Sequence, residues 1–140
     1  KAYPGDFETS ENYPFVKPGK YGPVNASSPK YALATAQKFM DLKVSIPILW
    51  VRGSDDQIVS DNSFFELGTL GKLGLVPNYP GEEIYPPQPM VKQTRYALEQ
   101  FSKGGGSYKE VVMEDTGHTP YIEKPEEFSR LLHTHLKQTS

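Results

Sequence analysis

The chain has 140 residues and a mass of 15.7 kDa, which is enough for one ordinary domain. Its 15 basic and 17 acidic side chains give a net charge of −2, so charge offers no reason to expect a nucleic-acid partner. The chain contains no cysteine, which excludes disulfides, thiol nucleophiles and cysteine zinc sites, and no apolar run reaches the roughly 18 residues of a membrane span.

The first 27 residues are interrupted repeatedly by proline and glycine, so we expect irregular structure there. Because the chain begins with Lys1 rather than methionine, we expect that this is not a natural start. Ser28 followed by Pro29 is typical of a helix start, since serine caps free N–H groups and proline suits the first helical position. This helix is expected to reach about Leu42.

Residues 46–51 form the strongest pattern in the chain, Ile-Pro-Ile-Leu-Trp-Val. A short apolar run with β-branched residues is typical of a strand that is covered on both faces, as in a parallel sheet. A buried helix is the alternative, but Pro47 and the shortness of the run argue against it. The segment that follows is then a loop leaving the carboxyl end of this strand.

Residues 60–88 are rich in glycine and proline and predict a long excursion, with a short helix possible over 62–69. Seven apolar side chains of this excursion could form an apolar mouth over a site, or could simply pack on the core. They are Phe64, Phe65, Leu67, Leu70, Leu73, Leu75 and Tyr79.

The second half of the chain predicts a helix, a strand and a final helix. From Pro89 an apolar face with helical spacing runs to Phe101, and Gly104–Gly106 ends that helix. Residues 110–113 predict a second short buried strand. Pro125 with two following glutamates predicts the start of the last helix. The expected core face of that helix comprises Phe128, Leu131, Leu132 and Leu136.

This alternation of helices and strands predicts an α/β fold with a parallel sheet. The sheet is expected to be incomplete, because a strand as apolar as residues 46–51 needs neighbours on both edges. We therefore expect that further strands lie upstream or on another chain.

Acidic and histidine residues follow the two predicted strands. Ligands bind at the carboxyl ends of the strands in open α/β sheets, and there Asp55 and Asp56 follow the first strand while His118 follows the second. A carboxylate beside a histidine fixes the tautomer of the ring and stabilises the imidazolium that forms when the histidine removes a proton from a nucleophile.

Two motifs resemble the α/β-hydrolase family. Residues 53–59, GSDDQIV, resemble the acid loop of that family, with Asp56 in the position of the acid. Residues 117–128, GHTPYIEKPEEF, resemble its closing motif, with His118 in the position of the catalytic histidine. The resemblance covers roughly residues 44–137 and implies the C-terminal part of the hydrolase core over 44–140. Residues 1–43 would then be the end of a cap or lid with the linking helix.

The family order is nucleophile, acid, histidine, but the chain contains no Gly-x-Ser-x-Gly elbow and no oxyanion loop of the His-Gly-Gly type. The resemblance therefore implies ester or related acyl hydrolysis of a small molecule by a triad whose serine lies outside this chain. The piece alone should be inactive, and its partner would be the N-terminal half of the same hydrolase. Two alternatives stay open. One is an aspartate nucleophile acting on epoxides or haloalkanes, and the other is a non-catalytic binding or regulatory module.

Other polar residues have plainer interpretations. Asp55 is the alternative acid, and Asp61 is expected to cap a following helix. His133 and His135 are expected to face solvent on the last helix, and Glu123 to make a structural hydrogen bond near the histidine loop. Other acidic residues, Glu114 and Asp115, are expected at a solvated strand end. No cofactor, metal or membrane association is expected, and the lack of cysteine and of a signal sequence is compatible with the cytoplasm.

Overall fold

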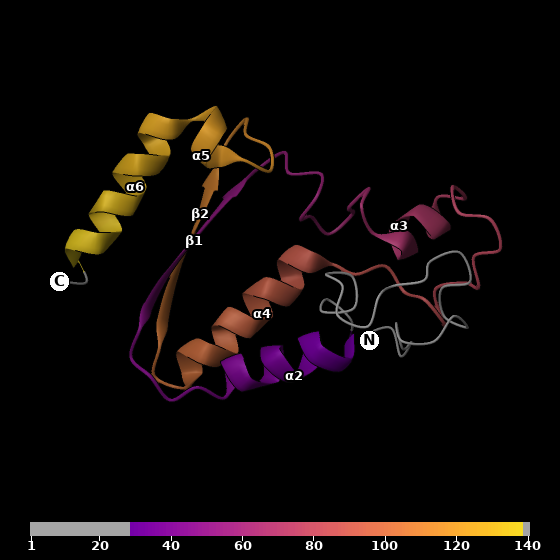
Figure 1. Ribbon diagram of the computed structural model, residues 1–140, viewed down its shortest axis with the longest axis horizontal. Helices are drawn as coiled ribbons and strands as arrows, with labels where there is room; N and C mark the ends of the chain where they lie inside the picture. Colours follow the sequence, from indigo (N-terminus) through magenta and orange to yellow (C-terminus); the bar gives the residue numbers. More distant parts are fainter. Residues whose placement is uncertain (1–28, 139–140) are drawn as a thin grey trace.

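The computed structural model describes residues 29–138, so the expectations for residues 1–27 and for the Ser28 cap lie outside the described residues. Figure 1 shows the elements in chain order. They are α2 (Pro29–Met40), β1 (Pro47–Gly53), α3 (Leu67–Lys72), α4 (Met90–Lys103), β2 (Ser107–Met113), α5 (Pro120–Glu123) and α6 (Pro125–Gln138).

The two strands pair in parallel, with Pro47 opposite Ser107 and Gly53 opposite Met113. The predicted α/β architecture with a parallel sheet is thereby confirmed. Within residues 29–138 the sheet has these two strands, ordered β1-β2. Because the pairing is parallel and in register, both carboxyl ends lie at the same end of the sheet, where Figure 1 places α5.

The helices lie on two sides of this sheet. Figure 1 shows α2 and α4 on one side of the strands and α6 on the other. The buried apolar side chains among the described residues are Leu98 and Phe101 of α4 and Met113 of β2. Phe101 stacks on Phe39 of α2 with ring centroids 4.9 Å apart, and its ring fills the space beside Gly106. This contact joins α2, α4 and the start of β2 in one small core.

A charged cluster also joins the sheet to α4. Glu110 of β2 accepts a hydrogen bond from Arg52 of β1 at 2.7 Å and two from Arg95 of α4 at 2.9 Å. Both guanidinium groups lie about 6 Å from the ring centroid of Trp50. Side chains of β1 are half-buried from Ile48 to Arg52. The described residues therefore do not supply the cover on both faces that the sequence of this strand predicts.

The last helix is less buried than its sequence predicts. Helix α6 has no buried residue, and the side chains of Leu132 and Leu136 are 39% and 51% exposed. Phe128 and Leu131 of the same face are half-buried. The expected core face is therefore confirmed only in part within residues 29–138, because Leu132 and Leu136 are exposed there whereas His135, expected to face solvent, is half-buried.

The excursion after β1 corrects two expectations. The helix expected over 62–69 is instead α3, which begins at Leu67 because the carboxylate of Glu66 accepts the N–H groups of Gly68 and Thr69. Asp61 caps α4, not the helix that follows it, since its Oδ1 accepts the N–H of Lys92 at 3.0 Å. Pro89 at the N-cap of α4 makes no side-chain cap of its own.

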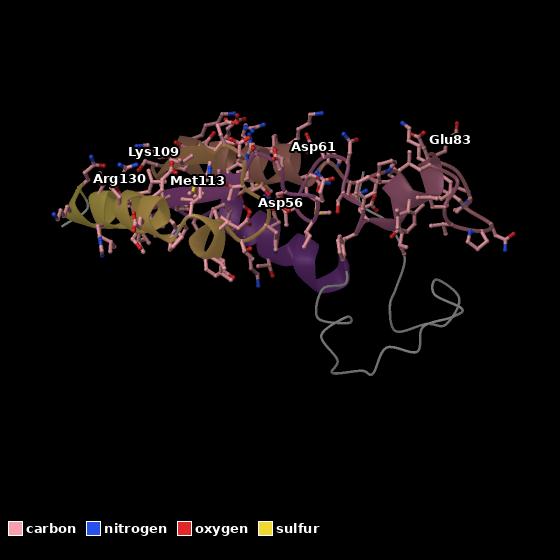
Figure 2. All side chains as sticks on the ribbon, turned by 90° about the horizontal axis from the view of Figure 1, so that it is seen from above. Asp56, Asp61, Glu83, Lys109, Met113 and Arg130 are labelled. Atoms are coloured by element: carbon pink, nitrogen blue, oxygen red, sulfur yellow. The ribbon has the colours of Figure 1, made fainter. Side chains whose placement is uncertain are left out.

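The excursion extends away from the sheet. Figure 2 shows Arg130 of α6 at one end of the molecule and Glu83 of the excursion at the other, with Asp56 between them. Several of its apolar side chains are largely exposed, so they do not pack on the core of the described residues. They are Phe64 at 53%, Phe65 at 73%, Leu67 at 45%, Leu73 at 56% and Leu75 at 65%.

Candidate active site

The loops that follow the two strands are bonded to each other through their backbones. Beyond the sheet, the N–H of Ser54 donates to the carbonyl of Met113, and that of Asp55 to the carbonyl of Thr116, both at 2.9 Å. Gly53 is required at this crossing, because a Cβ there would overlap the carbonyl oxygens of Thr116 and Gly117. These contacts fix the loop after β1, which carries Asp56, relative to the loop after β2, which carries His118.

Asp56 is held by its own loop. Its Oδ1 accepts the N–H of Ile58 at 2.8 Å and that of Val59 at 2.9 Å, which is an Asx-type turn. Its side chain is 9% exposed. Two backbone bonds thus orient one carboxylate oxygen and leave the second, Oδ2, free to face the other loop.

The second oxygen of Asp56 meets His118. Oδ2 of Asp56 lies 3.0 Å from Nδ1 of His118, and the histidine side chain is 44% exposed. An ionised carboxylate is an acceptor, so the proton lies on Nδ1 and the lone pair of the neutral ring lies on Nε2. The structure therefore brings together Asp56 and His118, the two residues that the sequence singled out.

The ionisation of Asp56 is maintained in this setting. Burial raises the pKa of Asp56, but the hydrogen bonds from His118, Val59 and Ile58 outweigh it and hold the pKa below its ordinary value of 3.8. The carboxylate is consequently charged at neutral pH. A fixed negative charge beside Nδ1 stabilises the imidazolium that a proton transfer to Nε2 would produce.

The histidine loop is held from the other side by Glu123. Its Oε2 accepts the N–H of Gly117 at 2.9 Å, while its Oε1 accepts the N–H of Thr119 at 3.2 Å and the hydroxyl of Thr119 at 3.1 Å. The bond from Gly117 is the main cause of the lowered pKa of Glu123, and burial opposes it only in part. The expected structural bond of Glu123 is therefore confirmed, and it is threefold.

The remaining candidates are not part of this pair. Asp55 is exposed and its carboxylate accepts from the hydroxyl of Ser54 at 2.8 Å, whereas the carboxylate that contacts the histidine ring is that of Asp56. Glu114 and Asp115 are exposed at the end of β2, as expected. On α6, His133 is exposed as predicted, whereas His135 is half-buried.

Two contributions to the site were not predicted from the sequence. Thr116 is 1% exposed and joins the loops, since its carbonyl accepts from Asp55 and its hydroxyl donates to the carbonyl of Glu114. Gly53 permits the close crossing. The position of Gly53 directly at the end of an apolar run was a usable signal, because a glycine there indicates a close backbone approach.

No grouping of three or more acidic or histidine side chains within residues 29–138 is suited to hold a metal ion. No helix in the same range has the length and apolar character needed to cross a bilayer. No protein-family model, curated protein sequence or solved structure matches the chain.

Proposed function

We propose that this chain is the C-terminal portion of an α/β-hydrolase and that Asp56 and His118 are the acid and the base of its catalytic triad. The observation that carries this proposal is the 3.0 Å contact between Oδ2 of Asp56 and Nδ1 of His118 at the carboxyl ends of two parallel strands. The two motifs that surround these residues resemble the corresponding loops of that family.

In the proposed mechanism, Nε2 of His118 removes the proton from a serine hydroxyl as the oxygen attacks the carbonyl carbon of an ester or related acyl substrate. The imidazolium then gives that proton to the leaving group, and an acyl-enzyme forms. Water then attacks the acyl carbon while the same histidine takes its proton. The bond from the acyl carbon to the serine oxygen breaks, the acid is released, and the imidazolium returns the proton to the serine oxygen. Asp56 keeps the ring in the tautomer whose lone pair is on Nε2. The substrate is a small molecule, and the mechanism uses no metal or cofactor.

The serine and its oxyanion donors would come from an N-terminal half of the same hydrolase, either joined upstream or present as a separate chain. Two features support such a partner. Both outer edges of the β1-β2 sheet lack a further strand among residues 29–138. Leu132 and Leu136 of α6 are exposed on the face that the sequence predicts to be a core face.

A fluorophosphonate probe tests this function, because it reacts with activated serines. The protein is measured by intact-mass spectrometry before and after the reaction, in the chain alone and in its assembly with the proposed N-terminal half. We expect no labelling of the 15.7 kDa chain alone and labelling of one serine on the N-terminal half in the assembly. His118→Gln should slow labelling by about 10³-fold or more. His133→Gln, an exposed histidine on α6, is the matched control and should leave the rate unchanged.

Each other outcome counts against the proposal. An assembly that stays unlabelled contradicts a serine hydrolase and favours an aspartate nucleophile or a non-catalytic module. Equal labelling of the His118 and His133 variants would show that His118 is not the base.

A further inference from the structure

One carboxylate, that of Glu123, accepts hydrogen bonds from the residues on both sides of His118. Oε2 of Glu123 binds the N–H of Gly117, and Oε1 binds both the N–H and the hydroxyl of Thr119. Glu123 is the last residue of α5, the single helical turn that directly follows this loop. The side chain of Glu123 therefore extends back along α5 to Gly117 and Thr119. Its hydrogen bonds to these two residues form a ring that encloses the backbone of His118.

The chemistry of this ring requires a carboxylate. All three bonds need an acceptor, and an ionised carboxylate is the side chain that presents two acceptor oxygens and no donor. A glutamine would turn its NH₂ group toward Gly117 or toward Thr119, so that a donor would face a donor. The fit is also close at Gly117, where a Cβ would lie 3.2 Å from Oε1 of Glu123.

The position of the His118 ring depends on this loop. On the acid side, the Asx turn of Asp56 orients its carboxylate within its own loop. On the histidine side, Lys124 adds a bond from Nζ to the carbonyl of Glu114 at 2.6 Å, but that bond lies before the glycine. Of the contacts made by the described residues, those of Glu123 are the ones placed immediately on both sides of His118.

We propose that Glu123 is a positioning residue, which holds the backbone at Gly117 and Thr119 so that Nδ1 of His118 stays bonded to Asp56 and Nε2 keeps a fixed direction. The catalytic consequence of this role rests on the proposed function, whereas the effect on the Asp56–His118 bond does not. A merely structural Glu123 would stabilise α5 and leave that bond unchanged in the folded protein.

Proton NMR of the imidazole measures this bond directly. The Nδ1 proton of His118 should give a low-field signal that exchanges slowly with water, and its absence in Asp56→Asn assigns it. We expect Glu123→Gln to speed that exchange about tenfold, as for the loss of one charged hydrogen bond. Glu123→Asp, which keeps a carboxylate, should recover part of the protection. Glu126→Gln removes the same charge from an exposed site in the first turn of α6 and should change nothing.

The proposal is overturned if Glu123→Gln keeps the exchange rate of the unaltered protein, or if Glu126→Gln speeds exchange as much. If Glu123→Gln does not fold, Thr119→Val decides, because it removes only the hydroxyl bond of the ring. Faster exchange in Thr119→Val supports the positioning role, and an unchanged rate refutes it. These signals need no nucleophile, so a failure of fluorophosphonate labelling would contradict the proposed hydrolase and leave this result intact.

Discussion

Replacing Asp56 by asparagine separates the two tasks of this side chain. The amide oxygen can take the place of Oδ1 and continue to accept the N–H groups of Ile58 and Val59, now 2.8 and 2.9 Å away. The NH₂ group then takes the place of Oδ2, 3.0 Å from Nδ1 of His118. A donor would face a donor, so we expect the imidazole to move its proton from Nδ1 to Nε2.

The magnitudes follow from the bonds that each variant keeps. Asp56→Asn keeps the Asx turn and loses only charge assistance, which should lower the free energy of unfolding by about 2 kcal/mol. Asp56→Ala removes every acceptor and leaves two backbone N–H groups without a partner in a part-buried loop. We expect about 4 kcal/mol for that variant. Asp55→Asn, at an exposed site next in sequence, should stay within about 0.5 kcal/mol of the unaltered protein.

Urea unfolding followed by the fluorescence of Trp50, the one tryptophan in the chain, measures these differences. Imidazole ¹⁵N NMR shows which nitrogen of His118 carries the proton. The reasoning fails if His118 in Asp56→Asn keeps the proton on Nδ1. It also fails if the alanine variant is no less stable than the asparagine variant, or if Asp55→Asn behaves like Asp56→Asn.

Three further outcomes are expected. Gly53→Ala should lower the free energy of unfolding by about 3 kcal/mol or more and abolish the low-field imidazole signal, because the new Cβ overlaps backbone of the loop after β2. A stable variant that keeps this signal would contradict the close crossing of the two loops. Asp61→Ala should lower the free energy of unfolding in urea by about 1 kcal/mol. It should speed amide hydrogen exchange at the start of α4 and leave the exchange in α3 unchanged. The stability that Glu110 contributes should be fully present above about pH 5 and be lost as the pH falls below about 4.5, since the bond from Arg95 chiefly lowers the pKa of Glu110 and burial opposes it only in part. A group whose pKa is lowered in the folded state loses its stabilising effect as the pH falls through that pKa. Glu110→Gln should therefore reduce the loss of unfolding free energy at low pH.

The sequence predicts the parallel pair from its two apolar runs, and parallel pairing brings the loops that follow them together. Both Asp55 and Asp56 lie in the first of these loops and His118 in the second. The choice of Asp56 rested on the resemblance of residues 53–59 to the acid loop of α/β-hydrolases. The length of β2 was underestimated, since residues 107–109 alternate between exposed and half-buried positions and carry no apolar run. Pairing with β1 extends the strand there, and that partner is distant in the sequence.

The wrong expectations for Asp61 and for the burial of α6 also concern contacts between residues that are distant in the sequence. An acidic residue before a helix predicts a cap, but sequence does not show which helix lacks one. Helix α3 is capped by Glu66, whereas α4 begins after Pro89 without a side-chain cap and takes Asp61 from 31 residues upstream. The periodicity of α6 predicted a core face of which Phe128 and Leu131 are half-buried and Leu132 and Leu136 are exposed. Its exposure was not foreseeable, because burial depends on the neighbours available.

The acid–histidine pair is assembled from short-range parts. One Asx turn fixes Asp56, one glutamate brackets the loop of His118, and two backbone bonds beyond the strands join the loops. Among the described residues, these contacts involve the ends of β1 and β2, their loops and α5, but not α6. We therefore infer that the pair forms without a partner chain. In the proposed hydrolase, a partner would then only have to present its nucleophile to Nε2 of His118. Half-exposure of His118 fits this role, since the ring nitrogen that would accept the proton must remain accessible.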